Sequence, residues 1–133
     1  MNVKRRGETT YFSLVEEGAA LFDKKEYALA ATRFWHAFRL RPGAPIVLFN
    51  IGRTLGELND PRCEDFYAAA ATQGNVDALY QLALLCVTSK RNEEAIGHLE
   101  AYLKGNPVED ECTRWARNTI WQLHPSPMLV WSK

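Results

Sequence analysis

A spacing of small residues and prolines recurs along the chain, and it constrains the fold more than any other feature. In residues 11–44, Gly18, Ala30 and Pro42 follow one another at twelve-residue intervals. The same intervals return in residues 76–109, where alanines stand at 83 and 95 and Pro107 closes the segment. An internal period of about 34 residues is the signature of a repeat protein, in which stacked units bury one another's apolar faces.

Apolar residues within each segment recur at helical rather than strand spacing, so we predict an all-α fold. Leu14, Gly18, Leu21 and Phe22 form one such stripe, at positions i, i+4, i+7 and i+8. Proline and glycine separate the stripes, and the short links between them predict antiparallel neighbours. The expected elements are helical hairpins near 11–41, 45–73 and 76–104 and a capping helix near 108–123.

The small residues have a packing role, because a large side chain where two helices cross would push their axes apart. We expect Gly18 and Ala30 to mark such a crossing in the first segment. The middle segment, residues 45–75, is about three residues shorter and less regular. Its second helix carries Glu64 where the other segments carry alanine, and we expect Asp60 and Pro61 to cap and begin that helix.

These intervals resemble those of the tetratricopeptide repeat (TPR) family, and residues 66–78 are similar to a Sel1-like repeat. The resemblance implies a right-handed solenoid of helical hairpins that binds another protein. It implies one TPR-like domain over residues 1–133, with repeats at about 11–44, 45–75 and 76–109. A capping helix at about 108–123 and an apolar tail at 124–133 would complete that domain.

In TPR proteins the first helix of each hairpin lines a concave groove, so the resemblance also implies partner-binding residues. They are mostly apolar or aromatic, which suits a peptide or helix of a partner protein. The residues are Phe12, Val15, Phe22, Phe49, Asn50, Arg53, Tyr80, Gln81, Leu84 and Val87. The alternative is that these side chains contact one another or the chain ends.

Some TPR domains grip a C-terminal carboxylate with lysine, arginine and asparagine at set groove positions. Here those positions hold Val15, Ala19, Asn50, Asp77 and Gln81, of which only the asparagine matches. A carboxylate held in a groove needs cationic or N–H donors, so the sequence argues against that mode of binding.

No grouping of residues predicts catalysis, a metal site or a cofactor site. The three histidines, His36, His98 and His124, are not four residues from one another, and none has a cysteine at a ligand spacing. Cys63 stands near an expected helix start, which lowers a thiol pKa in some proteins, but no base accompanies it. Acidic pairs such as Glu93 and Glu94 suit first turns of helices.

Composition excludes further classes of function. The formal net charge is zero, which argues against a nucleic-acid partner. No apolar segment follows the basic N-terminus, and no stretch reaches the length of a membrane helix, so we expect no signal peptide and no membrane insertion. Three cysteines without a close pair favour a reducing, cytoplasmic setting. The oligomeric state stays open.

We interpret the chain as a non-catalytic adaptor that binds a peptide or helix of a partner protein in an apolar groove. Two alternative functions remain. Small cytosolic chaperones of bacterial secretion systems resemble this architecture, whereas an enzyme has no motif in its favour.

The tail residues Met128, Leu129, Val130 and Trp131 are apolar. We expect the capping helix to cover them, the groove and a neighbouring copy being the other possibilities.

Overall fold

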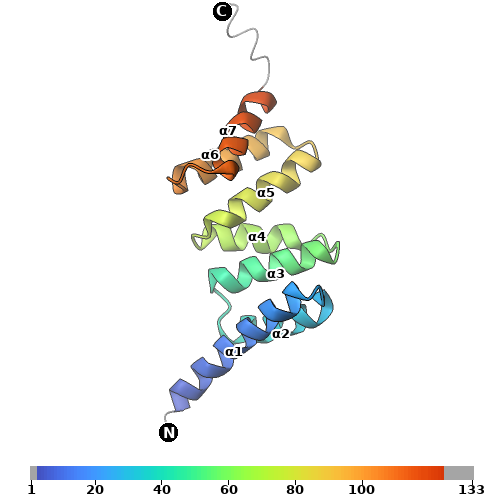
Figure 1. Ribbon diagram of the computed structural model, residues 1–133, viewed down its shortest axis with the longest axis vertical. Helices are drawn as coiled ribbons and strands as arrows, with labels where there is room; N and C mark the ends of the chain where they lie inside the picture. The colour runs from blue at the N-terminus through green and yellow to red at the C-terminus, as the bar shows by residue number, and fades with distance from the viewer. Residues whose placement is uncertain (1–2, 125–133) are drawn as a thin grey trace, which may run out of the picture. The chain divides into compact units, whose positions relative to one another are not determined.

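The computed structural model describes the backbone of residues 3–124 and the side chains of residues 10–124. Within these residues the chain forms seven α-helices and no strand, which confirms the all-α prediction (Figure 1). The chain divides into two compact units, Met1–Asn75 and Val76–Lys133. The first unit holds α1 (Val3–Asp23), α2 (Tyr27–Leu40), α3 (Pro45–Glu57) and α4 (Cys63–Thr72). The second holds α5 (Val76–Thr88), α6 (Asn92–Gly105) and α7 (Glu111–Leu123). The single domain over 1–133 stays a prediction.

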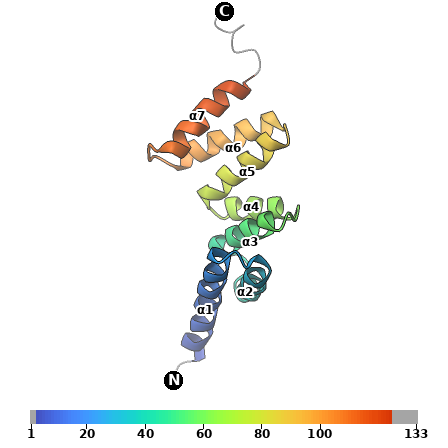
Figure 2. The ribbon, with the colours of Figure 1, turned by 45° about the vertical axis from the view of Figure 1, so that its right-hand side comes forward.

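Consecutive helices pack as antiparallel hairpins, α1 with α2, α3 with α4 and α5 with α6 (Figures 1 and 2). The hairpin boundaries agree with the sequence prediction except at the beginning of α1. That helix starts at Val3 rather than near residue 11. Residues 3–10 are mostly lysine, arginine, glutamate and threonine and include no proline, so nothing in them prevents the helix from starting at Val3.

All three hairpin turns have the same backbone conformation. Lys25, Asn59 and Lys90 adopt left-handed φ angles of 64°, 58° and 61°. After each of them, the next backbone N–H donates to a carbonyl five residues back, closing the first helix of the hairpin. These bonds run from Glu26 to Leu21 (2.9 Å), from Asp60 to Leu55 (2.8 Å) and from Arg91 to Cys86 (2.8 Å). The repeat predicted from side chains is therefore also present in the backbone.

Glycine allows the two helices of a hairpin to approach closely in the first two repeats. A Cβ atom added at Gly18 would lie 2.5 Å from Cε1 of Phe34 on the partner helix. One added at Gly52 would lie 2.8 Å from the ring of Tyr67. In the third repeat Ala83 and Leu99 share one buried cluster. The small residues thus stand at the helix crossings, as the sequence predicts.

The middle repeat differs from its sequence prediction in register. Cys63, not Glu64, takes the small-residue position: it is buried and lies four residues before Tyr67, as Ala30 lies four before Phe34. The helix also begins at Cys63 rather than at Pro61. The Asp60 carboxylate accepts a hydrogen bond from the Arg62 backbone N–H (3.0 Å) instead of capping α4. The crossing residues of this hairpin, Gly52 and Cys63, are eleven residues apart, one fewer than in the other two hairpins, and this spacing accounts for the shift.

Helix α7 covers the last hairpin, which confirms the predicted capping helix. It starts at Glu111, because the Asp110 carboxylate accepts from the Thr113 backbone N–H (2.9 Å) while the Thr113 hydroxyl accepts from the Asp110 N–H (2.8 Å). Ala116 joins Ala83, Leu99 and Tyr102 in the buried cluster of the second unit. Beyond His124, the predicted apolar tail lies outside the described residues.

Candidate functional site

Three of the predicted groove residues come together on the first unit, where α1 and α3 lie against each other. The guanidinium carbon of Arg53 is 4.3 Å from the centre of the Phe22 ring and 5.7 Å from that of Phe49. Both distances are within cation–π range, so the cation of Arg53 is held by two rings contributed by different helices. All three side chains are only partly buried and remain in reach of a partner.

Two further predicted residues lie on α1. Phe12 is 52% exposed, and the Arg41 guanidinium lies 4.3 Å from the Tyr11 ring and 5.3 Å from that of Phe12. Val15 is half-buried on the same helix. We call the residues Phe12, Val15, Phe22, Phe49 and Arg53 the α1–α3 face. Its main chemical feature is Arg53 lying over two aromatic rings, and Arg41, which is not part of the face, lies over Phe12.

Asn50 does not belong to this surface. Asn50 is only 9% exposed, and its backbone carbonyl accepts a 2.7 Å hydrogen bond from the buried Thr54 hydroxyl. The side chain is part of the packed interior of the first unit. The only groove position that matched the carboxylate-binding pattern is therefore not an open donor.

The other predicted residues lie on α5 in the second unit. Tyr80 packs against Tyr102 and Trp115, with ring centres 5.4 and 5.3 Å apart. Burial raises the pKa of Tyr80, and the neighbouring Cys112 acts in the same direction. Tyr80 is thus in contact with its hairpin partner α6 and with the capping helix α7. Gln81, Leu84 and Val87 are half-buried on the same helix.

An aromatic cluster that was not predicted from the sequence lies on the second helices of the first unit. Trp35 and Phe38 on α2 and Phe66 on α4 meet edge to face, with ring centres 5.3 to 6.0 Å apart. The Arg62 guanidinium lies 6.0 Å from the Trp35 ring. The available signal was an aromatic residue after two of the three core positions of α2, Trp35 after Phe34 and Phe38 after Ala37.

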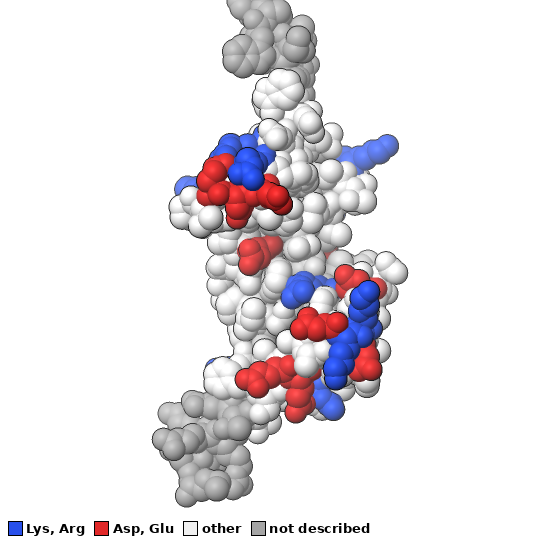
Figure 3. Space-filling model, viewed as in Figure 1, with Lys and Arg blue, Asp and Glu red and all other residues white. Residues whose placement is uncertain are grey.

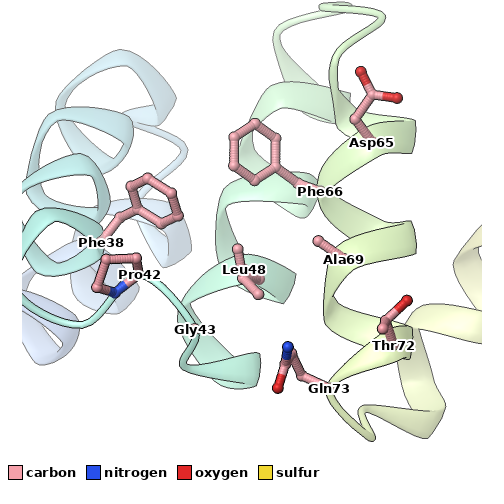
Figure 4. A pocket seen from close by; sticks show the side chains of 9 residues that line it. All are labelled: Phe38, Pro42, Gly43, Leu48, Asp65, Phe66, Ala69, Thr72 and Gln73. Carbon is pink, nitrogen blue, oxygen red and sulfur yellow. The ribbon is translucent and has the colours of Figure 1, made fainter.

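Next to this cluster lies a cavity of about 390 Å³, the α2–α4 pocket, shown in Figure 4. The rings of Phe38 and Phe66 and the side chain of Leu48 project into it, whereas Asp65 points away (Figure 4). Its remaining walls are Pro42, Gly43, Ala69, Thr72 and Gln73. An apolar pocket of this size accommodates one large side chain of a partner.

The structure offers no support for cysteine chemistry at Cys63. The residue is 7% exposed, and burial raises the pKa of its thiol, which disfavours the reactive thiolate. The nearby Asp60 carboxylate is committed to Arg62, whose hydrogen bonds lower the pKa of that carboxyl. His36 is exposed on α2.

Charges of both signs are interleaved on the surface. On the face in Figure 3, lysine and arginine lie beside aspartate and glutamate in mixed patches, and wide areas between them are uncharged. The pairs Arg33–Glu17 (3.0 Å) and Arg117–Glu109 are examples. Among the described residues, no helix has the length and apolar character needed to cross a membrane.

No family model matches the sequence, and no curated protein matches it. Solved structures do. The type III secretion chaperone SycD of Yersinia enterocolitica, in complex with a peptide of the translocator YopD, superposes with a TM-score of 0.79 at 12% identity, over 86% of this chain and 92% of that one.

Two TPR domains are similar to a comparable degree. The first TPR of Spaghetti (RPAP3), bound to the HSP90 peptide SRMEEVD, gives a TM-score of 0.75 at 19% identity, over 86% of this chain and 94% of that one. The Sgt2 TPR domain of Aspergillus fumigatus gives 0.74 at 20% identity, over 85% and 78%. The Sel1-like character of residues 66–78 stays a prediction. The chain has the TPR-like fold, with about three helical hairpins and a capping helix.

Proposed function

We propose that this protein is a non-catalytic adaptor that holds a peptide or helix of a partner protein on the α1–α3 face. The arrangement of Arg53 between Phe22 and Phe49 carries the proposal. Aromatic side chains offer large contact areas at low cost in rotamer entropy, and arginine adds directed donors, so this is the composition of a binding hot spot. The α5 residues Gln81, Leu84 and Val87 remain candidates for additional contacts.

The chemistry of the face indicates which segment it binds. Phe12, Phe22 and Phe49 offer apolar area, and Arg53 places a fixed positive charge over two of these rings, with N–H groups that can donate to a carboxylate. We infer a segment with an apolar or aromatic side chain next to a carboxylate. A clamp on a C-terminal carboxylate is not proposed, since Val15 and Ala19 supply no cation and Asn50 is buried.

Proteins of similar fold support this kind of function. The RPAP3 domain and SycD are each seen with a bound peptide. None of the three cysteines, all within the described residues, forms a disulfide, which agrees with the cytoplasmic location that we propose.

A chaperone of a bacterial secretion system is the second candidate. The likeness to SycD favours it, as does the apolar α2–α4 pocket. Co-expression separates the two functions. A chaperone's substrate is insoluble when expressed alone and becomes soluble with this protein, whereas an adaptor's partner is folded and soluble in both cases.

A random peptide library displayed on phage tests the adaptor function. Selected peptides should be rich in apolar residues next to aspartate or glutamate. Fluorescence anisotropy should then show that Phe49→Ala weakens binding by about 1 to 3 kcal/mol, the loss of one hot-spot residue. Circular dichroism of the variant checks that its helices are intact.

Two control variants locate the binding surface. His36→Ala, at an exposed position on α2, should bind as tightly as the native protein. Phe66→Ala should do the same, because Phe66 lines the α2–α4 pocket. If no peptide is enriched, or if Phe66→Ala rather than Phe49→Ala abolishes binding, the α1–α3 face is not the binding site.

A further inference from the structure

The α5–α6 hairpin brings together three residues whose side chains bind metals in other proteins. One ligand atom from each of Cys86, Glu94 and His98 lies within 4.8 Å of the other two. Cys86 is fully buried in the last turn of α5, His98 is half-buried and Glu94 is exposed. The group therefore reaches from the core of the second unit to its surface.

The turn geometry of the hairpin creates this arrangement. The Arg91 N–H donates to the Cys86 carbonyl (2.8 Å), so α6 begins directly beside the last turn of α5. Glu94 and His98 are four residues apart on α6, and side chains at that spacing share one helix face. Their separation from Cys86 in sequence conceals the cluster, which is why the spacing of cysteines and histidines predicted no metal site.

We propose that Cys86, Glu94 and His98 bind a transition-metal ion of the zinc class. Thiolate, imidazole and carboxylate are the ligand types that Zn²⁺ takes, at about 2.3, 2.0 and 2.0 to 2.2 Å. Ligand atoms at those distances around a tetrahedral ion lie about 3 to 4 Å from one another. Because the three atoms already lie within 4.8 Å, small rotamer adjustments complete the site.

The charges also favour a divalent ion. A thiolate and a carboxylate together balance two positive charges, so the ion enters the buried edge of the hairpin as a neutral group. The thiolate selects against Mg²⁺ and Ca²⁺, which prefer oxygen ligands. Exposed Glu94 leaves the fourth coordination position open to water.

An ion pair between Arg91 and Glu94 competes with the metal ion. The Arg91 guanidinium lies 3.3 Å from one carboxylate oxygen of Glu94. Glu94 is exposed, and exposed ion pairs of this kind contribute little stability, so the pair does not prevent coordination by the carboxylate. The bound ion would fasten α5 to α6 and stabilise the second unit, because metal binding to a folded site adds to the free energy of folding.

Cobalt spectroscopy tests this proposal on the full-length, reduced, metal-free protein. Titration with Co²⁺ should give one bound ion per chain, with a thiolate-to-cobalt charge-transfer band and the intense visible bands of a four-coordinate ion. Zn²⁺ should displace the cobalt and raise the melting temperature. The charge-transfer band reports directly on a cysteine ligand.

Variants assign the ligands. Cys86→Ala should abolish the charge-transfer band. His98→Gln and Glu94→Gln should each weaken binding by more than the roughly 10- to 100-fold that follows loss of an outer-shell partner. Cys112→Ala, which removes another thiol of the second unit, and His36→Gln should change neither the band nor the affinity.

Three results would overturn the site. They are absence of the band in the folded native protein, persistence of the band in Cys86→Ala, and its loss in Cys112→Ala. If Cys86→Ala does not fold, as judged by circular dichroism, His98→Gln, at a half-buried position, decides. Native affinity in that variant excludes the site.

Discussion

Single residues decide how closely the two helices of each hairpin approach. Gly18 and Gly97 are both helical glycines, but a Cβ at Gly18 would overlap the Phe34 ring, whereas one at Gly97 meets nothing within 4 Å. The first glycine is required by packing, and the second only adds entropy to the unfolded chain.

Alanine substitution should therefore act in opposite directions at these two positions. We expect Gly18→Ala to destabilise the protein by about 1 to 3 kcal/mol, the usual cost of overpacking a core. Gly97→Ala should stabilise it by about 0.5 to 1 kcal/mol. Urea unfolding of the two variants and the native chain measures both changes, and a shift of the same sign in both would contradict the packing argument.

Tyr67 gives the first unit a dependence on alkaline pH. Its ring packs against Gly52, and burial raises the pKa of its hydroxyl to about 12. In the unfolded chain Tyr67 loses that proton near pH 10. The stability that Tyr67 contributes by staying protonated in the folded protein is therefore complete below pH 10 and declines as the pH approaches 12.

We expect the free energy of unfolding to fall by up to about 2 to 3 kcal/mol between pH 10 and 12 through this residue. Denaturant unfolding across that range should show a shallower decline of the free energy of unfolding for Tyr67→Phe, which keeps the ring and removes the ionisable hydroxyl. The pKa values of Cys63, Tyr80 and Tyr102 are raised as well, so part of the slope should remain in the variant. An identical pH dependence in the variant and the native chain would exclude Tyr67 as its source.

At the scale of helices, the positions of the small residues test the hairpin register. Ala30 is fully buried in α2, and Ala28 is exposed two residues earlier. Ala30→Leu should cost about 1 to 3 kcal/mol, because the added atoms must displace α1 or strain the core. Ala28→Leu should change stability little. Thermal melts that match for the two variants would contradict the register.

The sequence predicts most of the helices because each repeat needs the same kinds of residue where its helices cross and where they end. Gly18, Pro42 and Pro107 have physical roles that their spacing reveals, and the structure confirms them. The register of α4 was not predictable in the same way. It depends on the spacing of eleven residues between Gly52 and Cys63, one fewer than in the other hairpins, which places Cys63 rather than Glu64 at the crossing. Asp110 and Thr113 fix the start of α7 through side-chain bonds that no periodicity reports.

The candidate site was only partly predictable. The family's groove positions led to Phe22, Phe49 and Arg53, and the structure brings those residues together. The same positions led to Asn50, which is buried, and to Tyr80, which packs on Trp115. The cluster of Cys86, Glu94 and His98 was missed, because the α5–α6 turn and not the sequence spacing brings its members together.

For the molecule as a whole, the central claim is that the α1–α3 face of the first unit binds an apolar segment that carries a carboxylate. Two surfaces of that unit compete for this role. One is the α1–α3 face, where Arg53 lies over two phenylalanine rings. The other is the α2–α4 pocket, which is lined by Phe38 and Phe66 and has no arginine in its wall.

Nuclear magnetic resonance with a selected peptide distinguishes the two surfaces most directly. Labelled protein is titrated with the peptide, and the shifts of the aromatic rings and of the arginine Nε–H groups are followed. We predict the largest changes at Phe22, Phe49 and Arg53, with Phe38 and Phe66 nearly unchanged. Changes concentrated at Phe38 and Phe66, with the Arg53 Nε–H signal unmoved, would contradict the account.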